Sequence, residues 1–185
     1  MQTGSINAMT EESSEPLSQQ YLTFIMNGEE YGVDILCVQE IRGWEPVTPL
    51  PNAPSHIKGV INLRGTIVPI VDLRQCFGLS AITYSAITVV IVLKVSHEEG
   101  CRIMGVVVDA VSDVYTLSKK EMKAPPNLGS TIETEFIEGF VSVGQKMIVL
   151  LDIDKLLIVD EMSELAGMND LAIEKYNYDK DKNLL

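Results

Sequence analysis

Residues 57–73 read IKGVINLRGTIVPIVDL, and residues 137–153 read IEGFVSVGQKMIVLLDI. The two stretches align without a gap, at an offset of 80 residues, with three identities and eight apolar-for-apolar matches over 17 pairs. Each consists of two apolar-rich runs around a short turn, Arg64-Gly65 in the first and Gly144-Gln145 in the second. Glycine at such a turn supplies the positive φ that a tight hairpin requires. The sequence therefore predicts one β-hairpin written twice, the mark of an internal duplication.

A second set of matches lies upstream of each hairpin. Gly32-Val33 corresponds to Gly105-Val106, residues 38–41 correspond to 111–114, and residues 21–27 correspond loosely to 88–94. The order of these motifs is the same in both halves. We therefore expect a first module over residues 20–85 and a second over 86–166.

The remaining elements are read from caps, turns and prolines. We expect strands at 21–26 and 30–33 around Asn27-Gly28, a short helix at 35–41 begun by Asp34 and ended by Gly43, helical segments after Asp72 (residues 73–77, stopped by Gly78) and after Asp152, and no regular structure across the proline-rich residues 46–54. Residues 153–166 have the spacing of an amphipathic helix that lies on the barrels.

Short strands separated by turns favour small closed barrels over one large sheet. The predicted fold class is therefore mainly β, with two small barrels related by internal duplication, a few short helices and a C-terminal amphipathic helix. We expect residues 1–19 to be a disordered N-terminal extension and residues 167–185 to be a charged, mobile tail.

The composition excludes several classes of function. Fourteen Lys and Arg residues against 26 Asp and Glu give a formal charge of −12, which argues against binding nucleic acid or anionic membranes. The longest apolar-rich run, residues 86–93, is far shorter than the roughly 20 residues of a membrane-spanning helix. With no signal peptide pattern, we expect a soluble intracellular protein without membrane insertion. Cys37, Cys76 and Cys101 lack CxxC spacing, so we expect them to be small buried apolar residues.

No catalytic or cofactor motif is found. The two histidines, His56 and His97, lack metal-ligand spacing, and there is no phosphate-binding loop. We therefore expect no metal, no cofactor and no enzymatic activity, although a catalytic site assembled only in space stays open. Arg42, Trp44 and Arg64 differ from their repeat partners, and Arg and Trp are enriched at binding hot spots. Alternatives are a structural salt bridge or a side chain without a role at the hairpin tip for Arg64, and a core position between the two modules for Trp44.

The motifs resemble those of a known family. Residues 31–43 (YGVDILCVQEIRG), 57–74 (IKGVINLRGTIVPIVDLR) and 105–114 (GVVVDAVSDV) resemble the bacterial chemotaxis coupling proteins of the CheW family. The resemblance covers about residues 20–165. It implies two SH3-like five-stranded β-barrels with some exchange of strands between them, so that the repeat boundaries need not be the barrel boundaries.

The resemblance also implies a function. Such proteins are cytoplasmic adaptors that couple the cytoplasmic tips of transmembrane chemoreceptors to the regulatory domain of the histidine kinase CheA in membrane-associated arrays. It places on the interaction surface Val38, Glu40, Ile41, Arg42, Gly59, Asn62 and Arg64. We expect a receptor helical hairpin to enter an apolar groove between the barrels, lined by Ile35, Val38 and Val108, and the kinase to contact mainly the first barrel.

Two questions stay open at this level. One is whether the adaptor forms rings with itself. The other is whether the chain instead regulates a kinase or a methylation system by binding without coupling receptors.

Overall fold

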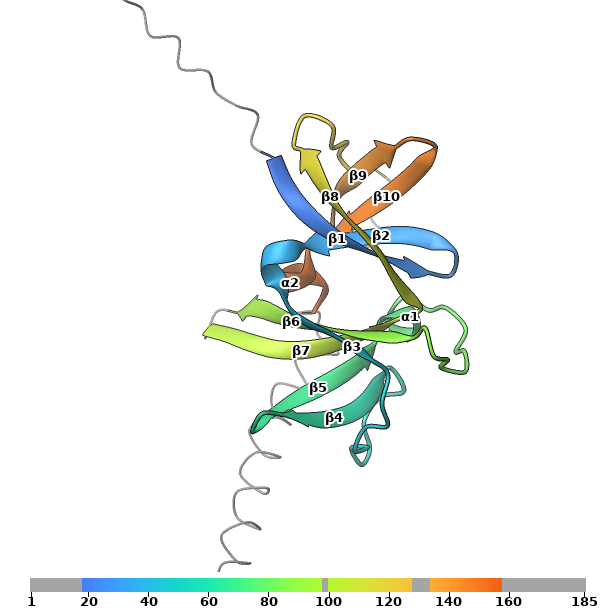
Figure 1. The fold of residues 1–185 in the computed structure, drawn as a ribbon, viewed down its shortest axis with the longest axis vertical. Coiled ribbons are helices and arrows are strands. Elements are labelled where there is room, and N and C mark those ends of the chain that lie inside the picture. Colours follow the sequence, from blue (N-terminus) through green and yellow to red (C-terminus); the bar gives the residue numbers. More distant parts are fainter. Residues whose placement is uncertain (1–17, 98–99, 128–133, 158–185) are drawn as a thin grey trace, which may run out of the picture.

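The computed structural model describes residues 18–97, 100–127 and 134–157, which form two stacked β-sheets with short helices beside them (Figure 1). The strands are β1 (Ser18–Met26), β2 (Glu29–Asp34), β3 (Val38–Gly43), β4 (Ile57–Leu63), β5 (Thr66–Asp72), β6 (Val89–His97), β7 (Gly100–Val108), β8 (Ala110–Ser118), β9 (Ile137–Val143) and β10 (Lys146–Leu151). The helices are the 3₁₀ turn η1 (Ile35–Cys37), α1 (Leu73–Cys76) and α2 (Ile153–Leu156). This confirms the predicted mainly β fold class with few helices.

The two halves of the chain interleave to make the sheets. Sheet 1 has the order β8-β1-β2-β10-β9, and sheet 2 has the order β3-β6-β7-β5-β4. Each sheet thus takes a hairpin from one half of the chain and three strands from the other. The boundary drawn between the repeats at residue 85 is therefore not a boundary between the sheets, and strands are exchanged as the resemblance implied.

The two sheets are built alike at the point of exchange. Gly32 of β2 pairs in parallel with Leu150 of β10, and Gly105 of β7 pairs in parallel with Ile70 of β5. A Cβ on Gly32 would lie 2.9 Å from the Leu150 side chain, and one on Gly105 would lie 2.5 Å from that of Ile70. Both glycines therefore allow a large apolar side chain of the neighbouring strand to cross their backbone. The repeated glycine seen in the sequence has the same role in both sheets.

The predicted turns have the expected backbone conformations. Asn27 and Gly28 have φ angles of 52° and 81°, and Arg64 and Gly65 have 51° and 89°. Gly144 has φ of 62° at the equivalent position of the second copy of the hairpin. In the Asn27-Gly28 and Arg64-Gly65 turns, two successive positive φ angles match the right-handed twist of the flanking strands, which is why these two loops close hairpins.

The helix predicted over residues 35–41 is wrong. Asp34 does begin a helical turn, because its carboxylate accepts a hydrogen bond from the Leu36 amide at 2.9 Å. The turn ends at Cys37, and the chain continues as β3, which pairs with β6. The β-branched Val38 and Ile41 favour this strand, and the ladder with β6 supplies backbone hydrogen bonds along it. The apolar spacing at 35, 38 and 41 fits a turn followed by a strand as well as it fits a helix.

The N-terminal boundary also differs from expectation, whereas the C-terminal helix begins where it was predicted. Residues 18 and 19, assigned to a disordered extension, belong to β1, because pairing with Ser118 and Leu117 of β8 continues the ladder. At the other end α2 begins as predicted, with Asp152 accepting a hydrogen bond from the Lys155 amide at 3.1 Å. The rest of the helix expected over 153–166, and the tail 167–185, lie outside the described residues.

Among the described residues, the core contains three apolar clusters. One lies between the sheets and joins residues of both, including Phe24 of sheet 1 and Ile91 of sheet 2, with Ile153 and Leu156 of α2. Another lies within sheet 1 around Ile148, and a third within sheet 2 around Val92, Ile70 and Val68. Burying each such side chain stabilises the fold by about 1.5–3 kcal/mol, so the clusters hold both sheets as one body.

A buried arginine links the sheets at their edge. The Arg74 guanidinium lies 2.6 Å from the Asp109 carboxylate and donates hydrogen bonds to the Ser80 carbonyl at 2.6 Å and to Asn27 Oδ1 at 3.0 Å. The backbone amide of Asn27 also donates a hydrogen bond to the Asp109 carboxylate at 2.8 Å. These contacts tie the β1–β2 turn of sheet 1 to α1 and to the β7–β8 junction. Asp109 is thus a structural ion-pair partner.

Candidate interaction surface

Strand β3 forms a free edge of sheet 2 and presents two different faces. Ile41 lies opposite Ile91, whose side chain belongs to the core between the sheets. Glu40 lies opposite Val92, which belongs to the cluster inside sheet 2. Directly opposed residues share a face of a sheet. Ile41 therefore points toward the junction of the sheets, while Glu40 points toward the interior side of sheet 2.

The polar side of β3 carries a chain of ion pairs. Arg42 contacts Glu40 Oε1 at 3.2 Å and Glu45 Oε2 at 3.3 Å, and Arg64 pairs with the other oxygen of Glu40. Arg64 stands on the β4–β5 turn, so its pair with Glu40 bridges the seam between the two edge strands of sheet 2, β3 and β4. The Glu40 side chain is 23% exposed and that of Arg64 is 73% exposed. The pair positions a guanidinium that still faces solvent.

The turn that carries Arg64 is held by Asn62. The Asn62 Oδ1 atom accepts a hydrogen bond from the Gly65 amide at 2.7 Å. Arg64 itself adopts the left-handed conformation, which costs an ordinary residue roughly 1 kcal/mol. The repeat partner of Arg64 is Gly144, which has a positive φ of 62° without the steric cost of a side chain. A strained arginine where the duplicate has glycine marks a side chain selected for something other than the turn.

Gly59 allows the seam to close. The backbones of Thr48 and Val60 exchange hydrogen bonds at 3.0 and 2.8 Å, so the proline-rich segment lies against β4. A Cβ on Gly59 would lie 2.1 Å from the Thr48 carbonyl oxygen, and its φ of 140° is one that side chains rarely adopt. The glycine is buried. Gly59 was predicted to lie on the interaction surface. It lies beneath that surface instead, where it lets the proline-rich segment pack against β4.

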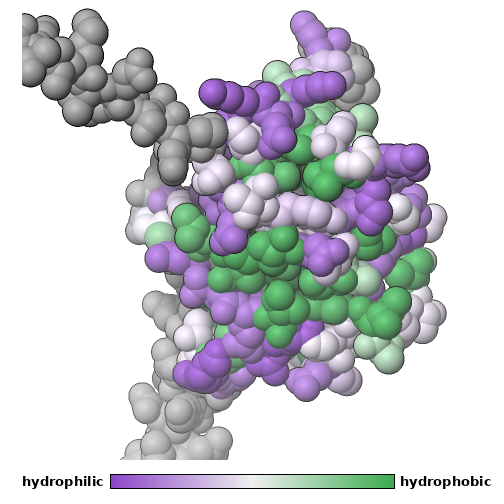
Figure 2. All heavy atoms as spheres, turned by 45° about the horizontal axis from the view of Figure 1, so that its top comes forward, coloured by the Kyte–Doolittle hydropathy of each residue, from purple (hydrophilic) through white to green (hydrophobic). Residues whose placement is uncertain are grey.

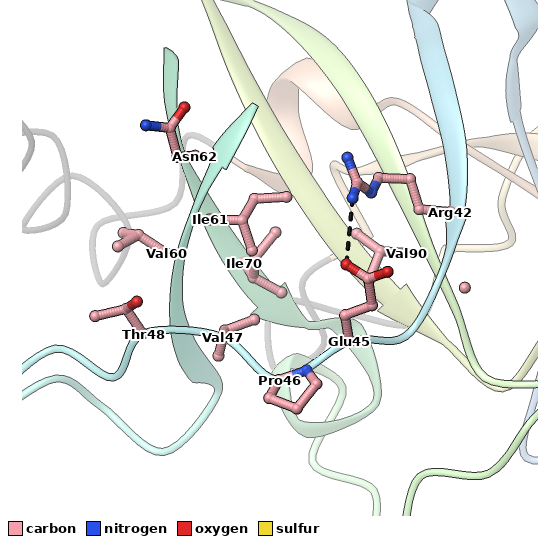
Figure 3. A pocket seen from close by; sticks show the side chains of 11 residues that line it. Arg42, Glu45, Pro46, Val47, Thr48, Val60, Ile61, Asn62, Ile70 and Val90 are labelled. Atoms are coloured by element: carbon pink, nitrogen blue, oxygen red, sulfur yellow. Dashed lines mark hydrogen bonds and ion pairs between the residues drawn. The ribbon is translucent and has the colours of Figure 1, made fainter. Parts of the chain in front are cut away.

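Two hollows lie along the seam. One, of about 220 Å³, lies between β3, the proline-rich segment and β4, with Ile70 and Val90 at its base and Arg42 and Glu45 at its rim (Figure 3). The second, of about 230 Å³, lies beside the ion pair of Glu40 and Arg64. Such shallow hollows are the size of a side chain or two. They suit protruding residues of a partner protein better than a small-molecule substrate.

The other side of β3 and the preceding turn η1 are apolar. Leu36 is 80% exposed and Ile41 is 46% exposed, while Ile35 and Val38 are half-buried against the core between the sheets. Figure 2 shows hydrophobic side chains gathered in a band across the middle of one face of the molecule. Exposed apolar side chains next to a core continue it outward, which favours docking of another apolar surface.

The structure thus brings together most of the predicted residues. Glu40, Arg42, Asn62 and Arg64 share the polar seam, and Ile35, Val38 and Ile41 share the apolar side. Val108 is 1% exposed in the core between the sheets, so it offers no surface for a groove lining. The sequence reading missed Leu36 and Glu45. Asp34 was read as the start of a helix over 35–41, so an exposed turn at Leu36 was not expected, and nothing local indicated that Glu45 reaches Arg42.

Within the described ranges, no group of three or more metal-ligating side chains is assembled. Burial and then the nearby Asp34 carboxylate raise the pKa of the Cys37 thiol to about 11, which keeps this sulfur protonated and unreactive at neutral pH. Cys37 and Cys76 are half-buried, whereas Cys101 is exposed, contrary to its expected burial. No helix in the described part of the chain is long and apolar enough to span a bilayer.

The structure decides between the two interpretations of Trp44, a partner contact and a core position between the modules. Its ring lies 4.2 Å from that of Tyr84, between centroids, and packs against the cluster inside sheet 2. It is therefore a partly buried core residue of sheet 2 and does not lie between the sheets. The Tyr84 hydroxyl in turn donates a hydrogen bond to Asp72 at 2.6 Å, which fixes the loop that precedes β6.

Two β-sheets that exchange strands, with a charged seam and an apolar side along β3, are typical of a protein that works through contacts with other proteins. A model of the CheW-like domain family matches residues 20–161. The chain is 46% identical over 151 residues to the chemotaxis protein CheW of Klebsiella aerogenes, covering 82% of this chain and 89% of that protein. It is 37% identical over 143 residues to the chemotaxis protein CheW of Rhizobium meliloti, covering 77% and 90%. The crystal structure of the scaffolding protein TtCheW from Thermoanaerobacter tengcongensis matches with a TM-score of 0.69 and 31% identity, covering 78% of this chain and 96% of that chain. The chain therefore belongs to the CheW-like domain family, as its motifs predicted.

Proposed function

We propose that this chain is a non-enzymatic chemotaxis adaptor that couples the cytoplasmic tips of transmembrane chemoreceptors to the histidine kinase CheA. The observation that carries the proposal is the 46% identity to a chemotaxis protein CheW across 82% of the chain. The description of the matching TtCheW as a scaffolding protein supports the same role. The adaptor would act in the cytoplasm and be recruited to receptor arrays at the membrane.

The two sides of β3 suit two kinds of partner. The apolar side, with Leu36, Ile41 and the half-buried Val38, suits the apolar face of a receptor helical hairpin, in the helix-in-groove mode. The seam with Arg42 and Arg64 suits a folded partner such as the kinase regulatory domain, which would contact mainly the strands β3, β4 and β5 contributed by the first half of the chain. Because an array joins many copies, modest pairwise affinities suffice.

Reconstitution tests the proposal directly. Purified chain is mixed with a receptor cytoplasmic fragment and the kinase, complexes are sedimented, and kinase autophosphorylation is measured with and without the chain. The expected result is that the kinase sediments with the receptor, and responds to it, only when the chain is present. A kinase that sediments and responds equally without the chain would contradict the proposal.

The second candidate is a regulator that binds a kinase or a methylation enzyme without coupling receptors. The same mixture separates the two. Binding of the chain to the kinase, with no dependence of its activity on the receptor at any receptor concentration, would favour this second function.

A further inference from the structure

A single connection joins the two halves of the chain that together build both sheets. Strands β1 to β5 come from the first half and β6 to β10 from the second, and the ladders β1–β8, β2–β10, β3–β6 and β5–β7 all pair one half with the other. Residues 78–88 form the loop that links the halves covalently. Each of these ladders can therefore form between two copies of the chain as well as within one, provided that this loop can open.

The loop is anchored to the first half and then turns once before β6. The Ser80 carbonyl accepts a hydrogen bond from the Arg74 side chain at 2.6 Å, and the Tyr84 hydroxyl donates one to Asp72 at 2.6 Å. Residues 85–88 form a turn that is closed by a backbone hydrogen bond of 3.1 Å between its ends. Straightening this one turn would carry β6 away from its own first half without breaking either anchor.

The same loop is uncharged and exposes apolar side chains on a strongly acidic protein. The chain has a formal charge of −12, yet residues 78–88 contain no charged side chain. Ile82 is 41% exposed and Ile87 is 68% exposed. Figure 1 shows the loop on the outside of the molecule, beside α1. Two opened loops that run past each other would cover these isoleucines, so a second copy of this chain is the partner that fits them.

We propose that two copies of this chain form a strand-exchanged dimer, in which the first half of each copy folds with the second half of the other. Residues 85–87 are the hinge, and the two opened loops lie side by side. Strand β3 of one copy then pairs with β6 of the other, so each interaction surface is built from both copies. Two halves joined by a short linker have an effective concentration in the millimolar range. Exchange therefore competes with the monomer at protein concentrations of about that magnitude.

A disulfide placed between the halves tests this proposal. Gln20 of β1 lies opposite Thr116 of β8, both residues are exposed, and their side chains meet at 3.5 Å. The full chain with Gln20→Cys/Thr116→Cys, and with its three natural cysteines replaced by alanine, is refolded from urea at about 10 µM and at about 1 mM and then oxidised. In a monomer the disulfide closes within one chain. In the strand-exchanged dimer two such disulfides join two chains, which a non-reducing denaturing gel shows as a covalent dimer.

The matched control is Ser142→Cys/Met147→Cys, which joins β9 to β10 of the same half and so closes within one chain in either form. Circular dichroism checks that each variant is folded, and sedimentation measures its mass in native buffer. We expect the covalent dimer of the first variant to increase at least about tenfold from the low to the high concentration, while the control stays monomeric on the gel. Three results would overturn the proposal: no dimer at the high concentration, a native dimer of the first variant that runs as a monomer on the gel, or as much covalent dimer in the control.

Substitutions in the loop test the place where the two copies meet. Ile82→Ser/Ile87→Ser should lower the native dimer fraction about threefold, because the opened loops then bury less apolar surface. Met147→Ser removes an apolar side chain that is 58% exposed on β10, outside the loop, and should leave the fraction unchanged. Equal dimer fractions for these two variants would show that the loops do not meet and would overturn this arrangement of the dimer.

Discussion

Arg64 combines an unfavourable backbone conformation with a side chain that is mostly exposed. Its φ is 51°, its side chain is 73% exposed, and its pair with Glu40 spans the seam of sheet 2. The repeat partner Gly144 also has a positive φ, of 62°. The duplicated hairpin therefore contains its own comparison between an arginine and a glycine in one turn.

Arg64→Gly should separate folding from binding. We expect the free energy of unfolding to change by less than about 1 kcal/mol, because relief of the left-handed arginine offsets the loss of an exposed ion pair. Affinity for a chemotaxis partner should fall by about tenfold or more, as for a hot-spot residue. Urea unfolding and titration with the kinase and the receptor fragment measure the two effects. Arg64→Lys, which keeps a positive charge, should bind better than Arg64→Gly; a fall in stability without a fall in affinity would make Arg64 structural.

Gly59→Ala tests the role of a supporting residue. The added Cβ would meet the Thr48 carbonyl oxygen at 2.1 Å, and the φ of 140° would be strained. We expect the variant to lose at least about 3 kcal/mol of stability, because the proline-rich segment must leave β4 or the strand must shift. Gly43→Ala is the control, since no atom lies within 4 Å of a Cβ placed there. Equal denaturation midpoints for the two variants would contradict this reading.

At the scale of elements, the strands of sheet 1 are tied together by a buried carboxylate. Glu30 of β2 is 4% exposed, accepts a hydrogen bond from Thr23 of β1 at 2.9 Å, and lies 3.2 Å from the Lys146 ammonium of β10. Burial alone would raise the pKa of Glu30, but hydrogen bonds from Thr23, Lys146 and Ser112 outweigh it and hold that pKa below its ordinary value. The ionised carboxylate is thus favoured by the fold.

Glu30→Gln should therefore change how the free energy of unfolding depends on pH in the acidic range. A lowered pKa in the folded state means that ionised Glu30 contributes its full stabilisation above the unfolded pKa, near 4.3, and loses it as the pH falls through the folded pKa. We expect Glu30→Gln to be about 1–3 kcal/mol less stable than the wild type at pH 7. As the pH falls below about 5, the variant should lose less stability than the wild type. Urea unfolding at a series of pH values measures this. Glu29→Gln, on an exposed position of the same strand, serves as the control, and parallel pH curves for wild type and Glu30→Gln would contradict the prediction.

At the scale of the whole molecule, the exchange of strands makes each half depend on the other. The pairings β1–β8, β2–β10, β3–β6 and β5–β7 all join different halves of the chain. Within one half only hairpins remain, and an isolated hairpin is at best marginally stable in water. The covalent link between the halves is the loop that precedes β6, where Ala81, Ile82 and Thr83 are exposed.

A chain cut after Ile82 should show this dependence. We expect fragments 1–82 and 83–185 to be largely unfolded alone and to combine one-to-one into a folded complex, because each supplies the missing strands of both sheets. Circular dichroism of the separate and mixed fragments, with sedimentation of the mixture, measures the effect. A fragment that folds alone as a monomer would show that the halves are independent.

Local physical chemistry made much of this protein readable from its sequence. The Asn27-Gly28 and Arg64-Gly65 turns, the caps at Asp72 and Asp152, and the repeated hairpin depend on backbone preferences of a few adjacent residues, so they were predicted correctly. The family motifs likewise lie in short continuous stretches. Where local patterns fit two structures, as at residues 35–41, the prediction of a helix was wrong, because pairing with β6 decided the outcome.

What only the tertiary structure decided are the relations between distant segments. Sheet membership depends on β2 pairing with β10 and β5 with β7, and no local pattern records which hairpin a strand will join. The burial of Val108 and the reach of Glu45 to Arg42 follow from how those distant segments pack. The sequence by itself determined the turns, the caps, the duplication and the family, because these depend on neighbours along the chain; packing in three dimensions decided which residues meet across it.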